Sequence, residues 1–150
     1  MRPNVDQYMM ALARTASLRG TCSRLQVGCI IAVNGDVRAT GYNGSIPRGP
    51  HCIDVGCDMV NGSCVRCVHA EINAICRAAR SGVSLIGGIA YVTHEPCRAC
   101  AYALACTDVK AIYFEKLRES STRQVNEDRE RVQAAMETSG ITLSTLPSLT

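Results

Sequence analysis

The sequence lacks the features that mark several functional classes. Tryptophan is absent, phenylalanine occurs once, and the formal net charge is only +3. Because surfaces that bind RNA are typically basic and aromatic, this composition argues against nucleic acid as a partner. No apolar run approaches the roughly 20 residues of a membrane span, and no signal-peptide core follows Met1. We therefore expect a cytoplasmic protein that does not enter membranes.

The bulk composition is that of an ordinary globular protein. The chain has 150 residues, of which 47% are hydrophobic and 19% are charged. This length suits a single domain, residues 1–150, with one sizeable core.

Cysteine is the exception, with ten residues. Without a secretion signal, metal binding or catalysis explains them better than a disulfide framework. Six of them form two groups, and the other four are scattered: Cys52, Cys57, Cys64 and Cys67 crowd one segment, Cys97 and Cys100 form a CxxC pair, and Cys22, Cys29, Cys76 and Cys106 stand apart. Cys29, Cys76 and Cys106 lie within apolar patterns, which predicts small hydrophobes in the core.

Hydrophobic periodicity and turn residues predict alternating helices and strands. Asn4 is suited to cap a first helix that Gly20 ends, and Asn34-Gly35 between two β-prone runs predicts a hairpin. The predicted helices after the hairpin cover 68–81, 96–106 and 123–139, and the predicted strands cover 27–33, 36–42, 88–93, 110–115 and 141–145. This order predicts an α/β fold, with a mixed five-stranded sheet that opens with the hairpin and lies between helical layers.

A segment rich in glycine, proline and cysteine, residues 43–66, shows no periodicity. A loop this long in a compact domain is usually functional or held together by some ligand.

His69, Cys97 and Cys100 are the strongest candidates for metal ligands. His69 lies near the start of one predicted helix, and both cysteines lie near the start of another, three residues apart on one face. Helix N-termini favour negative charge and therefore thiolates. Three protein ligands leave a fourth tetrahedral position for water, as in catalytic zinc sites.

Glu71, two residues after His69, is placed to reach water beside such a metal without binding it, which makes it a candidate proton shuttle. The alternative is that His69 and Glu71 are solvated helix residues and that both cysteines are core thiols.

The motifs HAE at 69–71 and PCRAC at 96–100 resemble those of the zinc-dependent cytidine and deoxycytidylate deaminase superfamily. The resemblance is more specific to the deoxycytidylate (dCMP) deaminase family, and it spans about 21–115 through TCSRLQVG, TGYNG, PHC, CVRCVHAEINAI and VTHEPC. It implies a three-layer α-β-α cytidine-deaminase-like fold and hydrolysis of dCMP to dUMP and ammonia, supplying dUMP for thymidylate synthesis.

The resemblance also implies a second, structural zinc near the long loop. Its expected ligands are Cys22, Cys52, Cys57 and Cys64, and Cys67 or His51 could replace one of them. Such a site would tether the loop and contribute folding energy. The alternative is a set of free cysteines packed in the loop.

By the same resemblance, Asn43 contacts the deoxynucleoside and the Ala70 backbone meets the base. Arg24 matches a position that can bind the 5′-phosphate, and Arg48 is a second candidate. Asn43 could equally be a turn residue, and each arginine could be a solvated surface charge. Relatives usually have tyrosine where this chain has Leu117, which puts one phosphate or base contact in doubt.

Three rival functions share parts of this pattern. One is a deaminase of a related nucleotide, such as a 5-substituted dCMP. A tRNA adenosine deaminase shares HAE and PCxxC but needs a surface for RNA. A zinc-stabilised binding module without chemistry would not need Glu71. The family resemblance further implies a homo-oligomer, often a hexamer, with dCTP as activator and dTTP as inhibitor.

Overall fold

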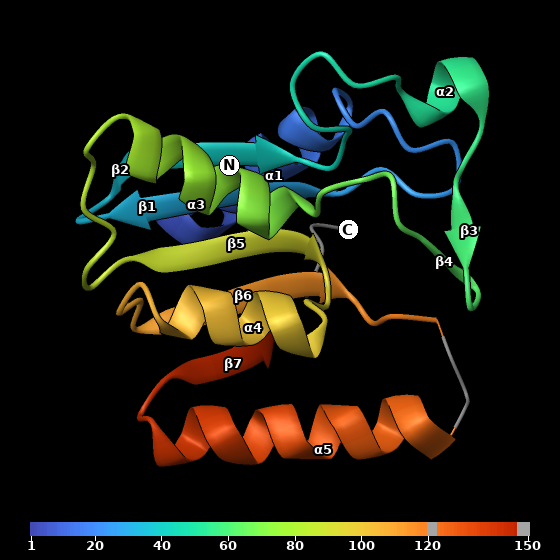
Figure 1. The fold of residues 1–150 in the computed structure, drawn as a ribbon. Helices are drawn as coiled ribbons and strands as arrows, with labels where there is room; N and C mark the ends of the chain where they lie inside the picture. The colour runs from blue at the N-terminus through green and yellow to red at the C-terminus, as the bar shows by residue number, and fades with distance from the viewer. Residues whose placement is uncertain (120–122, 147–150) are drawn as a thin grey trace.

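The computed structural model describes residues 1–119 and 123–146 (Figure 1). In chain order its helices and strands are α1 (Val5–Ser17), β1 (Gly28–Val33), β2 (Asp36–Tyr42), α2 (Cys52–Val55), β3 (Met59–Val60), β4 (Ser63–Cys64), α3 (Ala70–Arg80), β5 (Ile89–His94), α4 (Arg98–Ala105), β6 (Ala111–Lys116), α5 (Arg123–Thr138) and β7 (Thr142–Thr145). The long helices and the five longer strands lie where periodicity predicted them, with ends shifted by one or two residues.

The five longer strands form one mixed sheet in the order β2-β1-β5-β6-β7. β1 pairs antiparallel with both β2 and β5, whereas β5, β6 and β7 run parallel. The hairpin between β1 and β2 turns at Asn34 and Gly35, whose φ angles of 53° and 82° are the positive values that a tight hairpin requires. The predicted mixed sheet with an N-terminal hairpin is confirmed.

Helices cover both faces of this sheet and complete the three layers. Met9 and Met10 of α1 pack against Ile30 and Tyr91 on one face. The other face carries α3, α4 and α5, and Figure 1 shows α3 and α4 side by side in front of the strands. Along the described residues, no helix combines the length and the apolar composition that a membrane span needs.

The loop at 43–66 contains structure that the sequence pattern did not reveal. It holds the short helix α2 and the two-stranded β3–β4 hairpin, and Gly44 bridges to Val68 just before α3. These three elements and the bridge are too short to produce a periodic hydrophobic pattern, which explains why they were missed.

The predicted burial of the scattered cysteines is correct only for Cys29. Cys29 is fully buried in β1, whereas Cys76 and Cys106 are exposed. The buried face of α3 is formed by Ala70, Ala74 and Ala78, so Cys76 points outward, and Cys106 lies at the C-terminal cap of α4.

Close packing of α3 against β2 fixes the position of the HAE segment. A Cβ at Gly41 would lie 2.0 Å from the Ala70 carbonyl oxygen and 2.7 Å from the Ala74 nitrogen. Both are shorter than any normal contact, so only glycine lets the first turn of α3 approach this strand. The start of α3, where His69 and Glu71 lie, is thereby positioned by the sheet.

Gly41→Ala should therefore destabilise the protein by about 3 kcal/mol or more, the upper range for overpacking. The free energy of unfolding from urea titration measures this. Thr40→Ala, at the exposed neighbouring position of the same strand, is the control and should cost less than about 1 kcal/mol. Equal stability of Gly41→Ala and wild type would contradict the close approach of α3.

Candidate active site

Two helices begin beside the end of β5 and place the predicted metal ligands together. His69 is the N-cap residue of α3, and Cys97 is the N-cap residue of α4, three residues after β5 ends at His94. Cys100 lies in the first turn of α4 and is buried. Unpaired backbone N–H groups and the positive end of each helix dipole therefore face one point, where they stabilise thiolates.

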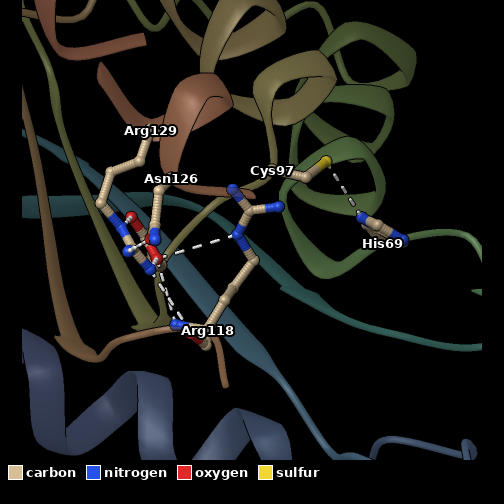
Figure 2. A network of polar contacts seen from close by, with 6 residues as sticks. His69, Cys97, Arg118, Asn126 and Arg129 are labelled. Atoms are coloured by element: carbon tan, nitrogen blue, oxygen red, sulfur yellow. Dashed lines mark hydrogen bonds and ion pairs between the residues drawn. The ribbon is translucent and has the colours of Figure 1, made fainter. Parts of the chain in front are cut away.

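The distances between these side chains fit a tetrahedral metal site. The His69 Nδ1 atom lies 3.3 Å from the Cys100 Sγ and 3.6 Å from the Cys97 Sγ (Figure 2). The three donor atoms all lie within 4.8 Å of one another. In a tetrahedral zinc site, bond lengths of about 2.0–2.3 Å separate the donor atoms by about 3.5–3.8 Å. One imidazole and two thiols at these distances fit zinc.

The protonation of the two cysteines also suits a metal site. Contact with the Cys100 thiol, together with hydrogen bonds from His69 and the backbone, lowers the pKa of Cys97 to about 3. The same contact raises the pKa of Cys100, because one proton is shared between the two sulfur atoms. A metal ion bound here would displace this proton.

Glu71 is the buried carboxyl group of the site. It lies in the first turn of α3, only 4% exposed, and its side chain contacts Cys100. Burial raises the pKa of this carboxyl above its usual range. The carboxyl therefore lies beside the three donor atoms in a setting suited to both accepting and donating a proton.

Comparison with known proteins agrees with this geometry. Residues 3–116 match the family model described as the cytidine and deoxycytidylate deaminase zinc-binding region. The chain belongs to this family.

Two relatives illustrate the similarity within the deaminase family. ComE operon protein 2 of Bacillus subtilis (strain 168) is 43% identical over 109 residues, which are 73% of this chain and 58% of that protein. The deoxycytidylate deaminase of Mycobacterium phage D29 is 33% identical over an alignment of 126 positions, which covers 77% of this chain and 97% of that protein. The chain thus spans little more than half of the first relative and nearly all of the second.

A solved deaminase structure shows the same fold. The crystal structure of dCMP deaminase from the cyanophage S-TIM5, in complex with dCMP and dUMP, superposes with a TM-score of 0.78 and 27% identity. The alignment covers 97% of this chain and 99% of that one. The expected cytidine-deaminase-like fold is therefore confirmed.

This deaminase-family chain has a second group of cysteines in its long loop. The Sγ atoms of Cys52, Cys64 and Cys67 lie within 4.8 Å of one another, and the Cys52 Sγ is 3.4 Å from the Cys67 Sγ and 3.6 Å from the Cys64 Sγ. Cys67, considered from the sequence as a replacement ligand, joins the group because the Gly44–Val68 bridge holds the chain beside it. The group thus contains two of the four ligands expected first, Cys52 and Cys64.

The other candidates for this second site lie around the group of three. Burial acts to raise the pKa of Cys22, but backbone hydrogen bonds and contacts with Cys57 and Cys67 outweigh it and lower the pKa. The Cys57 Sγ also lies 3.5 Å from the Ser23 Oγ. His51 is engaged elsewhere, since its Nδ1 lies 3.0 Å from the Thr21 Oγ1.

Asn43 uses its side chain to shape the loop before β1. Its Oδ1 accepts a hydrogen bond from the Val27 N–H at 2.8 Å, and its Nδ2 donates to the Leu25 carbonyl at 2.7 Å. The side chain is buried and fixes the segment that carries Arg24. Its contact with a deoxynucleoside stays a prediction.

The two arginines predicted for the phosphate are both exposed. The Arg24 Nη1 lies 3.5 Å from the Met59 Sδ and from the Gly62 carbonyl oxygen, so Arg24 lies against the β3–β4 hairpin. Arg48 lies in a turn with φ of 66°. Phosphate binding by either stays a prediction.

The sequence pattern missed a charged network directly beside the metal ligands. It joins Glu95, two residues before Cys97, to Arg118 after β6 and to Arg129 on α5 (Figure 2). The three residues come from separate parts of the chain and form no motif. The one signal in the sequence was Leu117, which precedes Arg118 and stands where relatives usually have tyrosine.

Proposed function

We propose that this chain catalyses the hydrolytic deamination of dCMP to dUMP and ammonia. The observation that carries the proposal is the buried Glu71 carboxyl beside the His69, Cys97 and Cys100 donor atoms, at the start of two helices. The names of the phage D29 and S-TIM5 relatives support the choice of dCMP.

His69, Cys97 and Cys100 would hold a catalytic zinc ion. When bound, zinc supplies a Lewis acid that makes water at its open coordination position easier to deprotonate. The starts of α3 and α4 would hold these three donor atoms in place around the ion.

Glu71 moves the protons of the reaction. Its carboxylate accepts a proton from the attacking water and delivers that proton to N3 of the cytosine ring. Water oxygen bonds to C4, and the C4–N4 bond breaks after Glu71 transfers the second water proton to the leaving amine. One water and the amine thus become a C4 carbonyl and ammonia.

The substrate contacts follow from the family resemblance. We assign the base to the backbone of Ala70, the first residue of α3, and the deoxyribose to Asn43. Ala70 is completely buried against β2, which supports a fixed backbone at this position. Arg24 and Arg48 are proposed phosphate contacts.

The second cysteine group is proposed to hold a structural zinc. Cys52, Cys64 and Cys67 would supply three ligands, and Cys22 is the favoured fourth because it is buried and contacts Cys67. The ion would connect α2, β4 and the segment that leads into α3. Cys57 is the alternative fourth ligand.

The remaining expectations rest on the family resemblance or, for the location, on the sequence alone. Supply of dUMP for thymidylate synthesis, cytoplasmic location, assembly as a hexamer, activation by dCTP and inhibition by dTTP all stay predictions.

Glu71→Gln should retain the fold and the zinc but lose nearly all release of ammonia from dCMP. General acid–base catalysis contributes about 10²–10⁴-fold, and a group used for several transfers should reach the upper end. Steady-state kinetics with equal zinc content in both proteins measure the loss. A variant that keeps more than about a tenth of the rate would show that Glu71 is not the shuttle, and a wild type without activity would favour a binding module.

Metal analysis of the reduced protein should find two zinc ions per chain, falling toward one in Cys64→Ser. Cys76→Ser, an exposed cysteine of α3, is the matched control and should keep both. Cys22→Ser and Cys57→Ser identify the fourth ligand, since the favoured assignment predicts loss of zinc only in Cys22→Ser. One zinc in the wild-type protein would refute the structural site and leave the catalytic site in place.

A further inference from the structure

Arg118 presents a cation at the edge of the proposed active site. Its side chain is 27% exposed, but its Nε atom is buried and has no hydrogen-bond partner in the described part of the chain. Figure 2 shows the guanidinium on the side that faces Cys97 and His69.

The carboxylate nearest to Arg118 is already paired with a different arginine. The Arg129 Nε and Nη2 donate to the two Glu95 oxygens at 2.6 and 2.8 Å, a bidentate pair. The Arg118 Nε lies 3.8 Å from the Glu95 Oε2, beyond hydrogen-bond length. Two cations therefore share one carboxylate, and the group carries a net charge of about +1.

The same two residues hold the Arg118 backbone in place. The Arg118 N–H donates to the Glu95 Oε2 at 3.1 Å, and the Arg129 Nη2 lies 3.4 Å from the Arg118 carbonyl oxygen. Asn126 accepts a hydrogen bond from the Arg129 Nη1 at 3.0 Å, which orients the guanidinium from α5. An arginine fixed at its backbone loses less entropy when its side chain binds an anion.

Arg118 is better placed for the phosphate than the two arginines predicted from the sequence. Arg24 and Arg48 are exposed, and Arg24 leans on the β3–β4 hairpin. Arg118 lies on the Cys97 side of the site, and Glu95, its carboxylate partner, is two residues before Cys97. A monophosphate is a dianion, and a planar guanidinium binds it through two parallel hydrogen bonds.

We propose that Arg118 binds the 5′-phosphate of the nucleotide substrate and that Glu95 and Arg129 are positioning residues for it. The proposal rests on the function proposed above and names a residue that distinguishes nucleotide from nucleoside. It places part of the substrate specificity after β6 and on α5, beyond the HAE and PCxxC motifs.

Arg118→Ala should lower kcat/KM for dCMP at least about tenfold more than it lowers kcat/KM for deoxycytidine, which has no phosphate. One lost charge-assisted hydrogen bond accounts for a factor of that size. Arg118→Lys should recover part of the loss, because lysine keeps the charge without the planar fork. An equal loss with both substrates would overturn the assignment, and a selective loss in Arg24→Ala alone would give the role to Arg24.

The positioning role is tested on Arg129. Arg129→Lys should raise KM for dCMP several-fold more than KM for deoxycytidine, with unchanged zinc content. Arg123→Ala removes another α5 arginine, one whose ion pair with Glu127 is exposed, and should leave both substrates unaffected. Equal effects of Arg129→Lys on both substrates would show a merely structural role.

Binding measurements separate this proposal from the proposed function. Calorimetry of the zinc-loaded wild type and Arg118→Ala with dUMP and deoxyuridine needs no turnover. A phosphate-dependent affinity that Arg118→Ala abolishes supports Arg118 even if no substrate is deaminated, in which case only the proposed function fails. Equal dUMP affinity in both proteins overturns the Arg118 proposal while leaving deamination untouched.

Discussion

The start of two helices at the end of one strand is the constraint on which the site depends. α3 and α4 each begin with a proposed metal ligand at the N-cap. Because β2, β5 and β6 run in the same direction, the helices that follow β2 and β5 both start at the same edge of the sheet. Gly41 lets α3 lie directly on β2, so the sheet sets the position of Glu71 relative to the donor atoms. Small movements of either helix would separate the carboxyl from the proposed metal ligands, and the proposed deamination requires them together.

Charged side chains extend this organisation toward the C-terminal part of the chain. Glu95 follows β5 and precedes Cys97, and it joins the ligand loop to Arg129 of α5. Burial is the largest single effect on Glu95, and it acts to raise the pKa of this carboxyl. Hydrogen bonds from Arg129 and the Arg118 backbone, together with the charges of both arginines, outweigh burial and hold the pKa below its usual range. α5 therefore does more than cover the sheet, since it contacts the loop that leads to Cys97 and the start of α4.

Much of the fold and the candidate catalytic group could be predicted because local signals point to them. The Asn34-Gly35 turn, the helical periodicity and the spacing of HAE and PCxxC each act over a few residues. The Glu95, Arg118 and Arg129 network has no such signal, since its members meet only after β6 and α5 have packed. Cys67 is a similar case: the sequence offered it only as a replacement ligand, and the Gly44–Val68 bridge decides that it lies beside Cys52. Burial of Cys76 was predicted wrongly because the apolar pattern did not show which face of α3 the alanines occupy.

The most direct test of the account is a comparison of substrates by ammonia release. Purified, zinc-loaded protein is offered dCMP, deoxycytidine, dCTP and a tRNA anticodon stem at equal concentration. The account predicts fastest release from dCMP, with dUMP as the product, slower release from the nucleoside and none from the RNA. Release from the RNA in preference to dCMP, or no release from any cytosine nucleotide, would contradict it.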